Sequence, residues 1–155
     1  MKFSLLVIGK TNEKYLEEGI KIFDNRLKNY TKFEMIEVRD IKGFQNPEDL
    51  KKKEADAFLE KIKDDDVLVL LDENGKSFSS VEFSQWIENQ QIRSVKHVVF
   101  IIGGAFGVHE VIRQRSNLVL SFSKMTFSHQ MIRLFFVEQL YRAFTIIKNE
   151  KYHNP

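Results

Sequence analysis

The amino-acid sequence predicts an α/β fold, with a mainly parallel β-sheet that carries helices on both faces. Two observations support this fold class. Short apolar segments alternate along the chain with segments of helical periodicity, and no linker separates them. Three segments, residues 5–9, 67–72 and 97–102, are almost entirely apolar. Such runs are typical of parallel strands that are buried on both faces.

The first part of the chain is predicted to form three strands separated by two helices. The strands are residues 5–9, 33–38 and 67–72. The first helix is indicated by apolar residues spaced three and four positions apart: Leu16, Ile20, Phe23, Leu27 and Tyr30. The second helix begins at Pro47, with Asn46 as its cap, and extends to about Ile62.

The second part of the chain is predicted to contain three helices and two strands. After a turn at residues 73–76, Ser79 and Glu82 form a capping box that marks a helix start. The strands are residues 97–102 and 118–123. A short helix is expected over about 108–116, and the last helix over about 130–148.

The last predicted helix is apolar around almost its whole circumference, from Met131 to Ile147. A helix of this kind must be buried. An interface between two copies of the chain would bury it, and this homodimer is the interpretation we favour. The alternative is a central helix packed between the sheet and neighbouring helices.

Size and composition set further limits. A chain of 155 residues fits a single domain, residues 1–155. The absence of cysteine excludes disulfide scaffolds, cysteine zinc sites, iron–sulfur clusters and cysteine nucleophiles. No apolar segment approaches the ~18 residues that span a membrane. No cleavage site follows the apolar residues 3–9, so we expect a cytoplasmic protein without a signal peptide.

Charge is distributed unevenly along the chain. Residues 91–155 contain nine Lys or Arg against three Asp or Glu, whereas residues 1–90 contain 15 against 19. A basic C-terminal part is compatible with a polyanion such as RNA. Chance clustering of surface charge would give the same pattern.

Two glycine-containing loops are candidate ligand sites. Residues 74–77, Asn-Gly-Lys-Ser, resemble the end of a phosphate-binding loop, but the first glycine of that motif is missing, so an ordinary Asn-Gly turn is favoured. Residues 103–107, Gly-Gly-Ala-Phe-Gly, follow an apolar strand, where glycines allow a nucleotide ligand to approach the backbone. No acidic residue lies between Glu110 and Glu138, which disfavours NAD. A purely structural turn is the alternative.

The third candidate loop, residues 121–130, is long and rich in hydroxyl groups. Its backbone N–H and C=O groups could bind an adenine without charged side chains. The alternative is an ordinary loop in which Ser128 caps the following helix.

Several segments of the sequence together match the motifs of a known family: KFSLLVIGK, LLDENGK, IIGGAFG, LSFSKMTFSHQMIR, EQLYRAFTI and the final YH. On these segments the sequence resembles the RlmH family of SPOUT-class (α/β-knotted) methyltransferases, and the resemblance covers the whole chain. It implies a Rossmann-like sheet with a C-terminal deep trefoil knot, and a homodimer formed through the C-terminal helix. It also implies that S-adenosylmethionine is the cofactor. The implied reaction is methylation of N3 of a pseudouridine in 23S rRNA on assembled ribosomes.

Position by position, the resemblance implies a cofactor site of these residues: Leu71, Gly103, Phe122, Ser123, Lys124, Met125, Thr126 and Phe127. These residues lie in or next to the candidate loops described above. Ser128 occupies a position that is proline in many members of the family.

Methyl transfer from a sulfonium is an in-line displacement that requires no metal. The N3 of a uracil ring must lose its proton, so a base or a stabilising cation is needed. The candidates are Arg142 for anion binding, His153 as base, Tyr152 for base stacking, and His129. Alternatives are an ion pair of Arg142 with Glu138, a disordered tail, and a capping role for His129.

The basic part of the chain offers these candidate RNA contacts: Arg113, Arg115, Lys124, Arg133, Lys148 and Lys151. Two other function classes stay open at this point. One is a ribosome- or RNA-binding α/β protein without catalytic activity, and the other is a nucleotide-binding protein that uses Gly75, Lys76 and Ser77. The three hypotheses predict different ligands. The methyltransferase would bind S-adenosylmethionine, the nucleotide-binding protein would bind a nucleoside triphosphate with magnesium, and the RNA-binding protein would bind neither.

Overall fold

The computed structural model describes residues 1–155 and contains one five-stranded sheet, in the order β2-β1-β4-β3-β5. All neighbouring strands are parallel. The strands are β1 (Lys2–Ile8), β2 (Lys32–Val38), β3 (Val67–Ser77), β4 (His97–Ile102) and β5 (Leu118–Ser121). The predicted α/β class with a parallel sheet is therefore confirmed.

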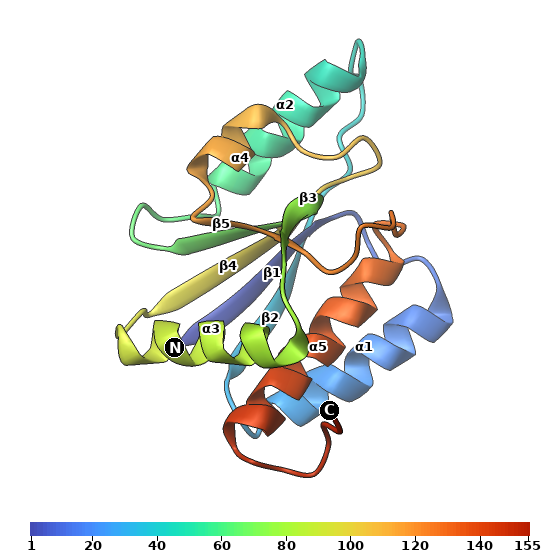
Figure 1. Ribbon diagram of the computed structural model, residues 1–155. Coiled ribbons are helices and arrows are strands. Elements are labelled where there is room, and N and C mark those ends of the chain that lie inside the picture. Colours follow the sequence, from blue (N-terminus) through green and yellow to red (C-terminus); the bar gives the residue numbers. More distant parts are fainter.

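Helices cover both faces of the sheet, as predicted (Figure 1). The helices are α1 (Lys14–Leu27), α2 (Pro47–Leu59), α3 (Ser80–Ile92), α4 (Glu110–Arg115) and α5 (Met131–Ile147). Helices α1, α3 and α5 lie on one face, and α2 and α4 on the other. None of them is both long enough and apolar enough to cross a membrane.

The two faces are separated by the alternation of side chains along each strand. In β1, Phe3, Leu5 and Val7 belong to the core beneath α1, α3 and α5, whereas Leu6 and Ile8 pack beneath α2 and α4. Both sets are buried. The apolar runs in the sequence thus reflect strands with two covered faces.

Strand β3 is longer than predicted. The sequence interpretation placed a turn at residues 73–76, but these residues belong to β3 (Val67–Ser77), which pairs with β5 on both sides of a register shift between Leu71 and Lys76. Gly75 allows this close pairing, because a Cβ there would lie 2.7 Å from the carbonyl carbon of Val119. The phosphate-binding-loop hypothesis is thereby excluded, since Lys76 lies in a strand and not in a loop.

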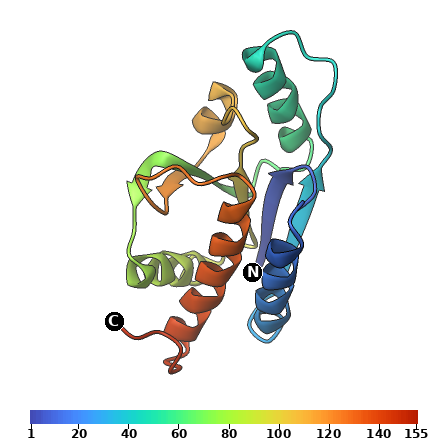
Figure 2. The same ribbon diagram turned by 90° about the vertical axis from the view of Figure 1, so that its right-hand side faces the viewer.

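Helix α5 lies across the sheet between α1 and α3, so it is central within one chain (Figure 2). Phe136, Val137 and Leu140 are fully buried against the sheet. This packing explains most of the apolar circumference without a second chain. Met131 and Phe135 nevertheless remain 40% and 41% exposed, and they form an apolar stripe on the outer side of α5.

The remaining boundaries differ from the predictions by a few residues. Helix α2 ends at Leu59 and not near Ile62, β5 ends at Ser121, and the predicted capping box of α3 is present. Ser128 Oγ accepts the N–H of Met131, so this serine caps the first turn of α5. The trefoil knot implied by the family resemblance stays a prediction.

Candidate functional site

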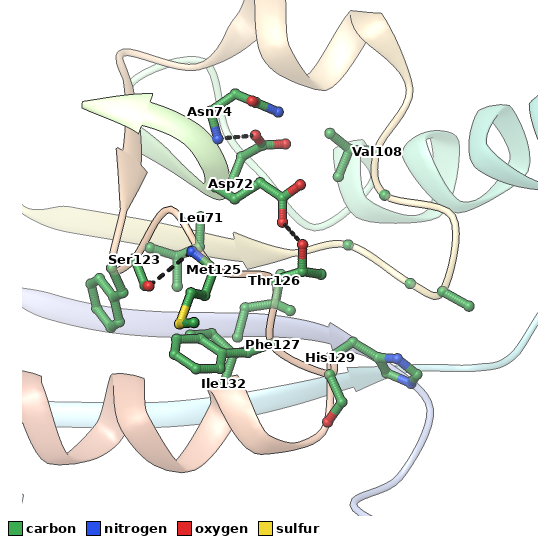
Figure 3. Close-up of a pocket in the computed structure, with 18 of the residues that line it drawn as sticks. Leu71, Asp72, Asn74, Val108, Ser123, Met125, Thr126, Phe127, His129 and Ile132 are labelled. Atoms are coloured by element: carbon green, nitrogen blue, oxygen red, sulfur yellow. Dashed lines mark hydrogen bonds between the residues drawn. The ribbon is translucent and has the colours of Figure 1, made fainter. Parts of the chain in front are cut away.

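A cavity of about 570 Å³ lies at the carboxyl ends of β4 and β5, beside the middle of β3. Three segments line it: residues 71–74 of β3, residues 102–108 from the last residue of β4 onward, and the chain from the end of β5 to the first turn of α5. In open α/β sheets, ligands bind at this edge because the loops there are free to vary while the strands hold them in place. The cavity is therefore the candidate ligand site (Figure 3).

The structure brings together most of the residues that the sequence analysis assigned to the cofactor. The following residues line the cavity: Leu71, Gly103, Phe122, Ser123, Met125, Thr126 and Phe127. Lys124, the remaining residue of that set, is exposed and does not line the cavity, so its assignment to the cofactor stays a prediction. Asp72, Glu73 and Asn74 also line the cavity, although they were not predicted as site residues: Asp72 was assigned to the end of a strand, and Glu73 and Asn74 to a turn.

The glycine turn is compact because two glycines face each other. A Cβ on Gly103 would lie 2.8 Å from the backbone carbon of Gly107, and Gly107 itself has φ +81°. A bridge between Gly104 and Gly107 closes the turn. The backbone of this turn is thus exposed to the cavity without side chains in between, which suits close contact with a flat ligand.

Hydrogen bonds hold the loop between β5 and α5 against β3. The Thr126 hydroxyl donates to the Glu73 carboxylate, and the Met125 N–H donates to Ser123 Oγ at 3.0 Å (Figure 3). Asp72 accepts the N–H of Asn74 at 2.8 Å and pairs with Arg113 at 2.8 Å. The cavity wall is therefore ordered by the protein's own contacts, and two carboxylates lie at its edge.

His129 borders the cavity at the start of α5. Burial lowers the pKa of His129, the neighbouring Arg133 lowers it further, and Asp40 partly opposes both. The imidazole is consequently neutral at neutral pH. The structure thus places His129 apart from the other three catalytic candidates, which do not line the cavity.

Arg142, Tyr152 and His153 form a second group around Glu138, which we call the tail cluster. Glu138 Oε1 accepts bonds from Arg142 at 2.7 and 3.1 Å and from the Tyr152 hydroxyl at 2.9 Å. The guanidinium of Arg142 lies 4.6 Å from the centre of the Tyr152 ring. The alternative ion pair with Glu138 is therefore present, and it coexists with contacts to both tail residues.

Protonation in the tail cluster follows from its contacts. An arginine can only donate, so the Nδ1 of His153, 3.3 Å from Arg142 Nη1, is the acceptor and the ring proton is on Nε2. Burial, followed by the bond to Glu138, raises the pKa of Tyr152. The phenol therefore stays protonated at neutral pH. The sequence analysis gave Glu138 only a possible ion pair with Arg142, from their spacing of four residues. Its bond to Tyr152 could not be predicted.

Only some of the side chains predicted to contact RNA are exposed and without a partner in the protein. Arg133 is wrong as an RNA contact, because its side chain is fully buried. Arg113 pairs with Asp72, and Arg115 donates to the carbonyls of residues 63, 64 and 66. Lys124, Lys148 and Lys151 are exposed.

The structure defines the class of protein: an α/β protein whose parallel sheet has helices on both faces and a ligand site at its carboxyl edge. A family model described as "Predicted SPOUT methyltransferase" matches residues 1–153. The chain belongs to this family of methyltransferases. It contains no group of three or more His, Cys, Asp or Glu side chains that could hold a metal ion.

Curated relatives narrow the assignment to the RlmH group that the sequence resemblance named. The chain is 49% identical to the "Ribosomal RNA large subunit methyltransferase H" of Christiangramia forsetii, over 99% of each chain. It is 46% identical to the protein of the same name from Cytophaga hutchinsonii, over 99% of this chain and 100% of the relative. The protein of that name from Parabacteroides distasonis is also 46% identical, over 99% of each chain.

Proposed function

We propose that this protein transfers a methyl group from S-adenosylmethionine to ribosomal RNA of the large subunit. The observation that carries the proposal is the cavity at the carboxyl edge of the sheet, lined by three loops of a SPOUT methyltransferase chain. The curated relatives, each named as a ribosomal RNA large subunit methyltransferase, support the choice of substrate. We further propose that the methyl acceptor is N3 of a pseudouridine in 23S rRNA. The substrate that the protein recognises would be the assembled ribosome and not free RNA.

The cavity residues fit this cofactor. A volume of about 570 Å³ lies within the ~300–1,000 Å³ usual for small-molecule sites. Ile102, Leu120 and Phe122 offer apolar walls for an adenine, and the glycine turn offers bare backbone. Asp72 and Glu73 supply negative charge to a ligand that carries a sulfonium and an ammonium group. When bound, S-adenosylmethionine supplies an electrophilic methyl group.

Removal of the N3 proton is the task of the protein's own residues. We propose that Arg142 stabilises the negative charge that develops on the base and that Tyr152 stacks on the base. We propose that His153 takes the proton at Nδ1 once Arg142 has moved from this nitrogen to the base. Ile132 borders the cavity, and Arg142 is ten positions further along α5, which corresponds to a rise of ~15 Å. A single chain therefore keeps the tail cluster away from its own cavity.

A homodimer through α5 would bring the two parts together. The exposed stripe of α5 consists of Met131 and Phe135, and Glu138 of the tail cluster follows Phe135 by three residues on the same helix. Beside Phe135 lies an apolar hollow of about 350 Å³. If two copies of α5 pack antiparallel around residue 137, Arg142 of one copy lies beside residue 132 of the other, at the cavity wall.

The dimer predicts a specific effect of a charge on the stripe. Phe135→Glu is expected to shift the protein from dimer to monomer in sedimentation equilibrium, because the interface would bury an unpaired carboxylate. The matched control is Ile92→Glu, which alters a 74% exposed apolar residue at the end of α3. We expect the control to remain dimeric. A wild-type chain that sediments as a monomer at ~10 μM would overturn the proposed dimer.

The proposed function is tested first by calorimetric titration with S-adenosylmethionine, with GTP–magnesium and NADH as controls. We expect dissociation constants on the order of micromolar for S-adenosylmethionine and no heat from the controls. Gly103→Ala is expected to weaken binding by more than ~30-fold, because the added Cβ would meet the backbone of Gly107 at 2.8 Å. Transfer of labelled methyl to ribosomes completes the test. Binding without transfer would favour an RNA-binding protein without catalytic activity.

A further inference from the structure

Glu54 on α2 is a buried acid without a partner. Glu54 is 5% exposed and forms no hydrogen bond or salt bridge with the protein, and its carboxylate oxygens keep a small contact with solvent, because no fully buried side-chain oxygen lacks a partner. Burial of an ionised carboxylate costs free energy unless the charge is compensated. A buried acid without compensation next to a cavity is therefore a candidate for a functional role.

The carboxyl group lies directly behind the glycine turn. A Cβ added to Gly104 would lie 2.8 Å and 3.0 Å from the two oxygens of Glu54. Gly104 itself borders the ligand cavity. One layer of backbone, with no side chain on it, thus separates the Glu54 carboxyl group from the space that a ligand would fill.

The charged surroundings of Glu54 are negative. Burial, followed by the charge of Asp40, raises the pKa of Glu54 to about 7. On its own helix, Lys51 pairs with Glu48 and Lys53 pairs with Asp49. From the start of α4, His109 also faces Glu48, at 3.4 Å. No cation near Glu54 is left to compensate its charge.

We propose that Glu54 is a positioning residue for the cofactor, which supports the glycine turn and compensates the positive charge of the ligand across Gly104. When the ligand binds, the Glu54 carboxyl group ionises and its proton passes to the solvent. The inference rests on the proposed function, since S-adenosylmethionine is the cationic ligand concerned. Asp40 adds negative charge on the same side, and its field also reaches His129 and Arg133.

The sign of the pH dependence follows from linkage. A positive ligand favours the ionised carboxylate, so binding lowers the pKa of Glu54 from its value of about 7 in the free protein. Affinity for the ligand must then rise with pH up to about that value and level off above it. Asp72, Glu73 and His129 also border the cavity. Burial lowers the pKa of His129, so its charge no longer changes above pH ~6.5, and comparison with Glu54→Gln assigns the remaining pH dependence to Glu54.

The test is calorimetric titration of the full chain with S-adenosylmethionine at pH 6.5, 7 and 8, in two buffers of different ionisation enthalpy. We expect the wild type to release ~0.5 proton near pH 7 and to bind roughly three- to four-fold more tightly at pH 8 than at pH 6.5, the most that one group with a pKa of about 7 can give. Glu54→Gln is expected to release no proton and to bind with the same affinity at each pH. Asp56→Asn, an exposed acid on the same helix, is the matched control and should behave as the wild type.

Two further measurements keep the outcomes separate. S-Adenosylhomocysteine lacks the sulfonium charge, so the wild type should release fewer protons with it. In thermal unfolding without ligand, Glu54→Gln should be more stable than the wild type at pH 8 and nearly equal at pH ~4. The buried carboxyl group weakens the wild-type fold as pH rises from the unfolded-state pKa of ~4.3 to the folded-state value of about 7. Proton release that persists in Glu54→Gln overturns this inference alone, whereas a wild type that does not bind S-adenosylmethionine overturns the proposed function with it.

Discussion

Replacing Arg142 by alanine is expected to lower the rate of methyl transfer by roughly 100-fold or more, whereas affinity for S-adenosylmethionine should stay within about three-fold. Arg142 does not border the cavity of its own chain, and across the proposed dimer we expect it to face the substrate base and not the cofactor. The substrate base, however, loses the cation that would stabilise its negative charge. Transfer of labelled methyl to ribosomes measures the first effect, and calorimetric titration measures the second.

Two variants show whether the loss is specific. Arg93→Ala removes an exposed arginine beyond the end of α3 and should leave both quantities unchanged. Arg142→Lys retains the charge but cannot bind Glu138 through two nitrogens as Arg142 does, so a partial loss is expected. If Arg142→Ala lost cofactor affinity and transfer to the same extent, Arg142 would be structural and its catalytic assignment wrong.

Much of the fold could be predicted from the sequence because the strands carry a strong local signal. A strand that is buried on both faces must be apolar throughout, and β4 was predicted with its exact bounds, His97–Ile102. The capping box of α3 is equally local, since Ser79 and Glu82 bond to each other's backbone. Strand order and the assignment of helices to faces depend on contacts between distant residues, and no local pattern specifies them.

The cavity was predictable in outline because the loops after parallel strands meet at one edge of the sheet. Its acidic part was missed. Asp72 and Glu73 lie in a segment rich in turn-forming residues, and only pairing with β5 across a register shift keeps that segment in β3. Such pairing is a long-range interaction that overrides local turn propensity.

The relation between the cavity and the tail cluster could not be read from the sequence. Arg142 and His129 are both on or next to α5, and their separation becomes clear only when the direction and burial of that helix are known. Glu138 shows the same limit. Its spacing predicts a bond to Arg142, but its bond to Tyr152 depends on the return of the tail.

Arg133 illustrates how composition can mislead. The sequence analysis counted it among the RNA contacts because it is a cation in a basic part of the chain. In the structure its guanidinium is fully buried and donates to the carbonyl oxygens of Ile8 at 2.6 Å and Gly9 at 3.0 Å. It also donates to the His129 carbonyl and to Thr11. Arg133 therefore joins the end of β1 to the start of α5.

We expect Arg133→Met to lower the free energy of unfolding by about 3–5 kcal/mol, measured by urea denaturation. Methionine fills much of the space, so most of the loss comes from the carbonyls of Ile8 and Gly9, which are left buried without a donor. Arg93→Met, on the surface, should change stability by less than ~0.5 kcal/mol.

The same variant also connects stability to the cavity. Arg133 donates a hydrogen bond to the carbonyl of His129, which borders the cavity. Loss of the Arg133 side chain should therefore make the cavity wall at His129 more mobile, as well as the end of β1. Cofactor affinity of folded Arg133→Met, measured below its unfolding transition, should therefore fall by ~10-fold. A variant as stable as the wild type would show that the four hydrogen bonds of the guanidinium only offset the cost of burying its charge, as a hydrophobic replacement of a buried ion can.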